Sequence, residues 1–138
     1  MIVVTGTKRS GTSLWMQMLK AANLPIIGEP YLGTWKESIH LANVGGFYES
    51  KLRYGVNYSN NPDVRTGQYL HPRTVVHHGV KIFVPGLIKT ELTFLHRVIS
   101  TIRPWQAYCH SIRRLHDMES AHWLALSDVP GKMPQQVK

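Results

Sequence analysis

The sequence predicts an α/β fold in which helices cover both faces of a central parallel sheet, as in a three-layer sandwich. Short β-branched apolar runs alternate with helical segments, and this order implies parallel strands joined by right-handed crossovers. The run at 79–85 has apolar residues on both faces, as a buried strand of a parallel sheet requires. With 138 residues, the chain is long enough for one hydrophobic core.

Local signals place the individual elements. Strands are expected at 2–5, 24–27, 79–85 and 98–102, helices at 12–22, 35–41 and 105–118, and a loop or short helix at 86–93. Asn23 suits the left-handed position that ends a helix, and Pro25 cannot prolong the helix before it. Pro104 suits the first position of the last helix. We expect one domain at 1–126 and a flexible tail at 127–138.

Composition and charge limit the classes of protein to consider. No apolar run approaches the roughly 20 residues of a membrane span. Met1 leads directly into the first expected strand, so no signal peptide is expected. The single cysteine, Cys109, excludes an internal disulfide framework and fits the reducing cytoplasm, where we expect the protein to work.

The net charge of +8 predicts an anionic ligand or partner. Nucleic acid is not the favoured partner, because the cations are scattered along the chain and no nucleic-acid-binding motif accompanies them. The histidines lack acidic or cysteine companions at ligand spacing, so no metal site is expected.

The first expected strand leads into a loop that holds two glycines, two cations and several hydroxyl groups. Strand, tight loop and helix N-terminus form a geometry that binds phosphate, because the first N–H groups of the helix are unpaired and its dipole favours an anion. Gly6, Gly11 and Ser13 fit the spacing of a P-loop, but Thr12 stands where that motif has its lysine. The missing lysine disfavours ATP or GTP chemistry.

Three stretches resemble the sulfotransferase family that uses 3′-phosphoadenosine 5′-phosphosulfate as its donor, and in particular the bacterial sulfotransferase-like branch. Residues 9–13 (Arg-Ser-Gly-Thr-Ser) resemble the family's 5′-phosphosulfate loop. Arg103 at a strand end, with Ser111 in the following helix, is similar to the pair that holds the donor's 3′-phosphate. Residues 43–50 resemble a stretch common in the bacterial branch, although Val44 replaces the usual proline.

The resemblance covers roughly residues 1–118 and implies a short or truncated family member that takes this donor as co-substrate and uses no metal. Because the carboxyl ends of parallel strands line one crevice, Arg9 and Arg103 are expected on the same rim of the sheet. The donor-binding residues that the resemblance implies are Lys8, Arg9, Ser10, Gly11, Thr12, Ser13, Leu14, Arg103 and Ser111.

Sulfuryl transfer needs positive charge at the leaving phosphate and a base for the acceptor hydroxyl. The resemblance gives the first role to Arg9, and Lys81 is similar to a lysine on the equivalent strand of cytosolic members. Those members carry a catalytic histidine two residues further on, where this chain has Phe83. Other branches use a glutamate, and the candidate bases here are Glu29, which is slightly preferred, Glu49 and, third, His40.

A sulfotransferase acting on a hydroxyl or amine is the favoured function, with a small molecule or a carbohydrate as acceptor. The main alternative is a non-catalytic relative that kept the fold, because residues 131–132 do not match the family's C-terminal loop over the nucleotide. Association into a homo-oligomer would be another way to cover the nucleotide. A P-loop kinase and a nucleic-acid-binding protein are the less favoured alternatives.

Overall fold

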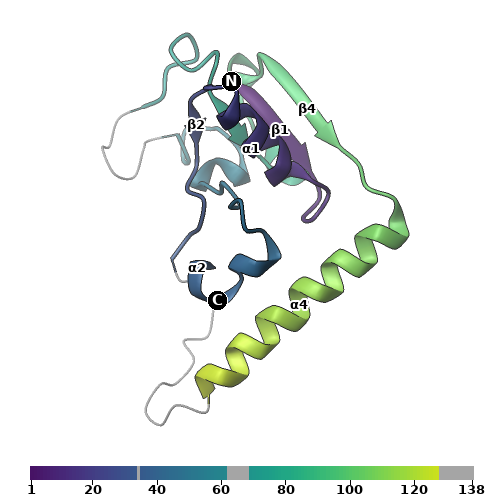
Figure 1. Ribbon diagram of the computed structural model, residues 1–138. Helices are drawn as coiled ribbons and strands as arrows, with labels where there is room; N and C mark the ends of the chain where they lie inside the picture. Colours follow the sequence, from purple (N-terminus) through teal and green to yellow (C-terminus); the bar gives the residue numbers. More distant parts are fainter. Residues whose placement is uncertain (34, 62–68, 128–138) are drawn as a thin grey trace.

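The computed structural model describes residues 1–33, 35–61 and 69–127 and shows an α/β fold built on a four-stranded sheet. The strands are β1 (Ile2–Gly6), β2 (Ile26–Ile27), β3 (Gly79–Lys81) and β4 (Arg97–Thr101). They lie in the order β2-β3-β1-β4, and every neighbouring pair is parallel. Figure 1 shows β1 and β4 side by side. The predicted parallel sheet is therefore confirmed.

The helices are α1 (Thr12–Ala21), α2 (Trp35–Ser38), α3 (Val84–Ile88) and α4 (Trp105–Ser127). Short 3-10 turns occur at His40–Ala42, Lys51–Tyr54 and Leu92–Phe94. Within the described ranges, no helix is both long enough and apolar enough to span a bilayer.

Alternation of side chains along β1 divides the core between the two faces of the sheet. On one face, Val3 packs in a buried cluster that Leu87 of α3 covers. On the other face, Val4 packs against Met16 of α1. Helices α1 and α3 therefore flank opposite faces, an arrangement compatible with a three-layer sandwich.

Helix α4 leaves the sheet after β4 and runs past α2 (Figure 1). Leu115 lies near its middle and is buried in a third apolar cluster with Ile39 and Phe47. Trp105 at its start and Trp123 near its end are exposed. The middle of α4 is therefore the part that holds this helix against the segment around residues 39–47.

Several predicted boundaries are wrong. The strand predicted at 79–85 ends at Lys81, because Pro85 fits the first turn of a helix and α3 begins at Val84. The strand predicted at 98–102 is β4, so Arg103 lies beyond the end of the strand rather than closing it. Helix α4 continues past the predicted end at residue 118, and Ser127, which was assigned to the tail, is helical. The rest of the predicted tail, 128–138, lies outside the described residues.

Gly86 in α3 should not tolerate a side chain. A Cβ at this position would lie 2.5 Å from the carbonyl oxygen of Arg53 and 2.7 Å from the carbonyl carbon of Tyr54, both backbone atoms. Glycine to alanine in an exposed helix interior gains about 1 kcal/mol, but this contact reverses the sign. Gly86→Ala should lower the free energy of unfolding by about 1–3 kcal/mol in urea denaturation.

Ile88→Ala is the matched control for that experiment, because Ile88 belongs to the same helix and its side chain is exposed. It should change stability little. If the Gly86→Ala variant is as stable as the wild type, α3 does not pack closely on the Lys51–Tyr54 turn.

Candidate anion-binding site

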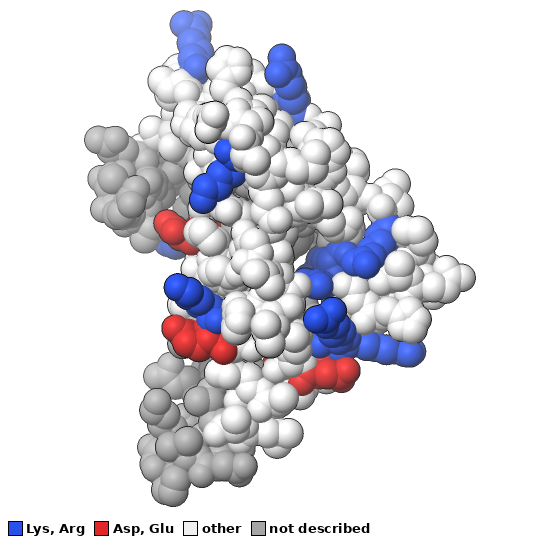
Figure 2. Space-filling view, viewed as in Figure 1, with Lys and Arg blue, Asp and Glu red and all other residues white. Residues whose placement is uncertain are grey.

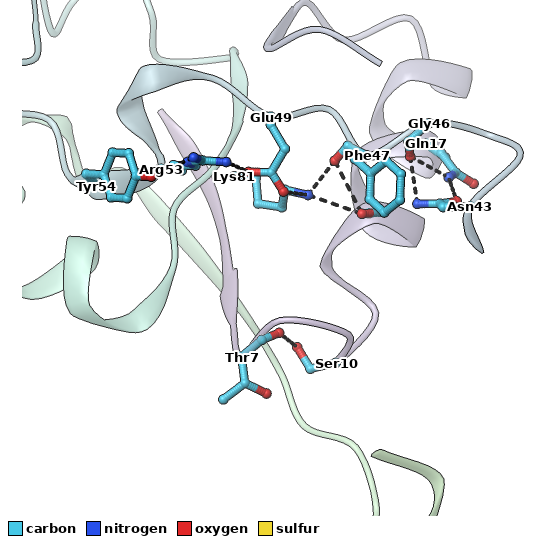
Figure 3. Close-up of polar contacts among 11 residues, drawn as sticks. Thr7, Ser10, Gln17, Asn43, Gly46, Phe47, Glu49, Arg53, Tyr54 and Lys81 are labelled. Carbon is cyan, nitrogen blue, oxygen red and sulfur yellow. Dashed lines mark hydrogen bonds and ion pairs between the residues drawn. The ribbon is translucent and has the colours of Figure 1, made fainter. Parts of the chain in front are cut away.

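The loop between β1 and α1 is held against β4. Gly6 ends β1, and a Cβ there would lie 2.3 Å from Thr101 Oγ1 and 2.4 Å from Ser10 Oγ. Ser10 Oγ donates to the carbonyl of Thr7 at 2.8 Å and lies 2.7 Å from Thr101 Oγ1 (the Thr7 contact is drawn in Figure 3). Glycine is therefore required at residue 6, and the Ser10 side chain fixes the loop instead of facing outward.

The N-terminus of α1 offers free backbone donors. Gly11 is the N-cap residue, with φ at 105°, and no side chain caps the helix. Among the described residues, none accepts a hydrogen bond from the N–H groups of Gly11, Thr12 or Ser13. The positive end of the helix dipole lies at the same place. Three N–H donors and a partial positive charge can therefore bind an anion.

A second group of cations joins this loop to α4. Arg9 Nε donates to Ser111 Oγ at 2.9 Å, and an Arg9 terminal nitrogen donates to the carbonyl of Ala42 at 3.1 Å. Arg103 donates to the backbone carbonyl of Arg9 at 3.1 Å. Arg9 and Arg103 therefore lie on the same rim of the sheet, as the parallel arrangement predicted.

The electrostatics of this group favour a negatively charged ligand. Burial lowers the pKa of Arg9, and the charges of Arg103 and Arg114 lower that pKa further. Each of these effects means that the guanidinium ion is held in surroundings that disfavour its positive charge. A bound anion would relieve the repulsion.

Lys81 reaches the same loop from β3. Val80 and Lys81 point to opposite faces, so the lysine lies on the α1 side, where its ammonium donates to Ser13 Oγ at 3.1 Å. The ammonium also donates to the carbonyl of Phe47 and lies 2.6 Å from Glu49 Oε1 (Figure 3). Lys81 is 2 % exposed and Glu49 4 %. Burial lowers the pKa of Lys81, and the negative charge of Glu49 opposes that shift.

Arg53 is the second cation beside the Glu49 carboxylate. Its guanidinium lies 3.6 Å from Glu49 Oε2, so the Glu49 carboxylate stands between two cations (Figure 3). The Lys51–Tyr54 turn brings Arg53 to this position, and the spacing of four residues from Glu49 allows the contact.

The segment from Asn43 to Glu49 is fixed by hydrogen bonds to α1. Gln17 Nε2 donates to Asn43 Oδ1 at 3.0 Å and to the carbonyl of Gly46 at 3.1 Å (Figure 3). Glu49 then forms a backbone bridge with Glu29. These contacts explain how an irregular segment can hold a buried carboxylate in a fixed position.

Together these groups line a cavity of about 400 Å³. Its charged lining residues are five cations and two acids, so positive charge predominates: Lys8, Arg9, Arg53, Lys81, Arg103, Glu49 and Glu119. Glu119 of α4 lies 3.4 Å from Lys8. Figure 2 shows Lys and Arg side chains gathered where α4 leaves the body of the molecule.

The structure brings most of the predicted site residues to this cavity and leaves others away from it. The predicted site residues that line the cavity are Lys8, Arg9, Gly11, Thr12, Ser13, Leu14, Glu49, Lys81 and Arg103. Ser111 contacts Arg9 without being one of the lining residues. Ser10 is buried against Thr101. Glu29 is exposed and lines a second cavity, and the exposed His40 lines neither cavity.

Sequence reasoning missed Arg53 and Glu119 as members of the site. Arg53 follows Glu49 by the spacing of an ion pair on a helical turn, which was a usable signal. Glu119 follows Ser111 and Leu115 at successive intervals of four on α4, so the three share one face of the helix. That periodicity was also present in the sequence.

Comparisons with protein-family models, curated proteins and solved structures find no match to this chain. Within the described ranges, no group of three or more His, Cys, Asp or Glu side chains is placed to hold a metal ion. The cavity supplies fixed positive charge and N–H donors, and such groups bind phosphate or sulfate anions.

Removing the Lys81 ammonium should be strongly destabilising. Lys81→Met leaves the buried Glu49 carboxylate with only the more distant Arg53 as a charged partner. We expect the free energy of unfolding to fall by about 3–5 kcal/mol in urea denaturation. Combining Lys81→Met with Glu49→Gln should restore part of the loss, because the unpaired charge is then gone.

Lys36→Met is the control for the loss of one positive charge, since Lys36 is exposed on α2. It should leave stability nearly unchanged. If the losses from Lys81→Met and Glu49→Gln simply add in the double variant, the two side chains are not coupled, and their pairing would not be the source of the effect.

Proposed function

We propose that the cavity binds 3′-phosphoadenosine 5′-phosphosulfate and that the protein is a sulfotransferase. The observation that carries this proposal is the convergence of two segments far apart in the sequence. Arg103 donates to the Arg9 carbonyl at 3.1 Å, and Arg9 donates to Ser111 at 2.9 Å. A ligand with phosphate groups at two ends of a ribose needs two separate groups of donors that open into one cavity.

The 5′ end of the donor is assigned to the start of α1. The loop around Gly11 then acts as a P-loop, in which the N–H groups of residues 11–13 bind the 5′-phosphate. Lys81 takes the charged role that the missing lysine has in other P-loops, because its ammonium reaches Ser13 from β3. The 3′-phosphate is assigned to Arg103, whose planar guanidinium lines the cavity, while Ser111 accepts a hydrogen bond from Arg9 and holds that side chain in place.

The reaction follows from this placement. An acceptor hydroxyl oxygen attacks the sulfur in line, the new S–O bond forms, and the bond from sulfur to the bridging phosphate oxygen breaks. The products are the sulfated acceptor and adenosine 3′,5′-bisphosphate. Lys81 and Arg9 stabilise the charge that gathers on the leaving phosphate. The acceptor proton passes to a carboxylate.

Glu49 suits the role of base better than Glu29 does. Glu49 lines the cavity and lies 2.6 Å from the Lys81 ammonium, whereas the Glu29 side chain is exposed and lines the other cavity. The acceptor is a hydroxyl or amine compound, either a small molecule or a carbohydrate, that enters beside Glu49.

A non-catalytic nucleotide-binding protein is the second candidate function, and the position of Glu49 favours it. Both of its carboxylate oxygens face cations, Lys81 and Arg53, and Phe83 lines the cavity where a histidine base stands in cytosolic sulfotransferases. An ion-paired carboxylate is a weaker base than a free one. Sulfate transfer therefore has to be measured separately from binding.

Binding should be tested first, by calorimetric titration with adenosine 3′,5′-bisphosphate. We expect binding that does not depend on Mg²⁺ and exceeds that of ATP with Mg²⁺. Arg103→Ala should weaken it by about 10- to 100-fold, because a charged hydrogen bond to phosphate is lost. Arg97→Ala is the control: it removes the same charge from the exposed start of β4, does not line the cavity, and should have little effect.

Preference for ATP with Mg²⁺ would favour a kinase instead. Equal losses from Arg103→Ala and Arg97→Ala would mean that only the general positive charge attracts the ligand, and the assignment of the 3′-phosphate to Arg103 would then be wrong.

Turnover should be tested with labelled donor and a panel of hydroxylated acceptors. Glu49→Gln should lower kcat by about 10²- to 10⁴-fold at saturating donor, because the glutamine cannot take a proton. Bisphosphate binding by the same variant separates the loss of the base from the loss of the ion pair with Lys81. Glu29→Gln should leave kcat within a few-fold of the wild type. No transfer by the wild type to any acceptor, combined with tight bisphosphate binding, would support the non-catalytic function.

A further inference from the structure

A second cavity of about 480 Å³ lies along the edge strand β2, apart from the anion-binding site. Ile27 of β2 and Leu52 form apolar walls, and both belong to the core cluster on the α3 face of the sheet. Asn61 also lines this cavity, and its side-chain amide pairs with both the N–H and the carbonyl of Leu70 at 2.9 and 3.1 Å. That pair of hydrogen bonds fixes one side of the cavity.

Most of the buried polar atoms without a hydrogen-bond partner belong to residues of this cavity. Within the described ranges, four buried side-chain oxygen or nitrogen atoms have no hydrogen-bond partner, and three of them belong to residues that line this cavity: Glu49 Oε2, Ser50 Oγ and His78 Nδ1. Glu49 Oε2 has an ion-pair partner in Arg53 at 3.6 Å, so Ser50 Oγ and His78 Nδ1 are the two of these three without a hydrogen-bond or ion-pair partner. Buried polar groups in proteins are almost always hydrogen-bonded. A ligand that enters this cavity can supply the hydrogen bonds that Ser50 Oγ and His78 Nδ1 lack.

The hydrogen-bonding chemistry of these atoms indicates which kind of ligand can bind here. A hydroxyl such as Ser50 Oγ can donate or accept, and it reorients by rotation about one bond. Burial lowers the pKa of His78, and the positive charges of the chain's amino terminus and His77 lower it further, so the neutral imidazole is favoured. Its Nδ1 then donates or accepts according to the tautomer. A ligand hydroxyl matches both groups because it has the same versatility.

Charge around the cavity disfavours an anion. Glu29 and Glu49 both line it, and their backbones form a bridge at one end. Lys51 and His78 line it as well, so there is no purely acidic surface for a cation. A neutral molecule with hydroxyl groups on a partly apolar frame fits this combination of walls and polar atoms.

We propose that this second cavity is a binding site for a small neutral hydroxylated molecule, which hydrogen-bonds Ser50 and His78 and packs its apolar frame against Ile27 and Leu52. The site is distinct from the anion-binding cavity, and Glu49 is the charged residue that lines both.

The test is an NMR titration of the labelled protein with trans-1,4-cyclohexanediol, which carries two hydroxyls on an apolar ring. We expect saturable shifts at the amides of Gly28, Ser50 and Gly79, and not at residues 11–13. The matched probe is 1,4-dioxane, a ring of the same size that cannot donate a hydrogen bond, and it should bind several-fold more weakly.

Ser50→Ala and His78→Leu should each weaken diol binding several-fold. Ser59→Ala is the control, because Ser59 is exposed and does not line the cavity. Arg103→Ala should leave diol binding unchanged, so the result is independent of whether the nucleotide assignment holds. If His78→Leu fails to fold, Ser50→Ala alone decides the question.

Three results would overturn the proposal. The first is the absence of saturable shifts with the diol, which would mean that the cavity holds only water. The second is equal affinity for diol and dioxane, since hydroxyl donation would then play no part. The third is diol binding that neither Ser50→Ala nor His78→Leu weakens.

Discussion

The buried ion pair between Lys81 and Glu49 is the constraint on which the site depends. Burying two charged side chains is unfavourable unless each finds close partners. Lys81 finds three, in Glu49, Ser13 and the carbonyl of Phe47. Because these partners come from α1 and from the irregular segment before residue 50, one side chain on β3 sets the relative position of three parts of the chain.

Two arginine side chains connect the loop between β1 and α1 to other parts of the chain by hydrogen bonds. Arg9 joins the loop to α4 through Ser111 and to the 3-10 turn through the carbonyl of Ala42, and Arg103 returns to the loop from the end of the sheet. The chain thus holds several like charges close together without an equal number of acids. Such an arrangement is costly by itself and becomes favourable when an anion enters.

Those parts of the fold whose signals are local could be predicted from the sequence. The first strand, its glycine-containing loop and α1 follow from neighbouring residues, and the parallel direction of the strands follows from the alternation of strands and helices along the chain. Strand ends could not be predicted as well: the apolar run at 79–85 concealed the start of α3 at Val84. The choice between Glu29 and Glu49 depended on the path of the intervening segment, which only tertiary hydrogen bonds such as those of Gln17 determine.

Strand β4 is at the edge of the sheet, and Val98 in the strand and Ile102 just after it are exposed. Arg97 begins the strand, and Arg103 follows its end by two residues. If two copies approached edge to edge in antiparallel fashion about Ser100, Arg97 of each would face Arg103 of the other, and the like charges would oppose pairing. Salt screens such repulsion, and an anion bound at Arg103 would remove part of it. Association of two copies through this edge would therefore depend on whether an anion occupies the positively charged cavity.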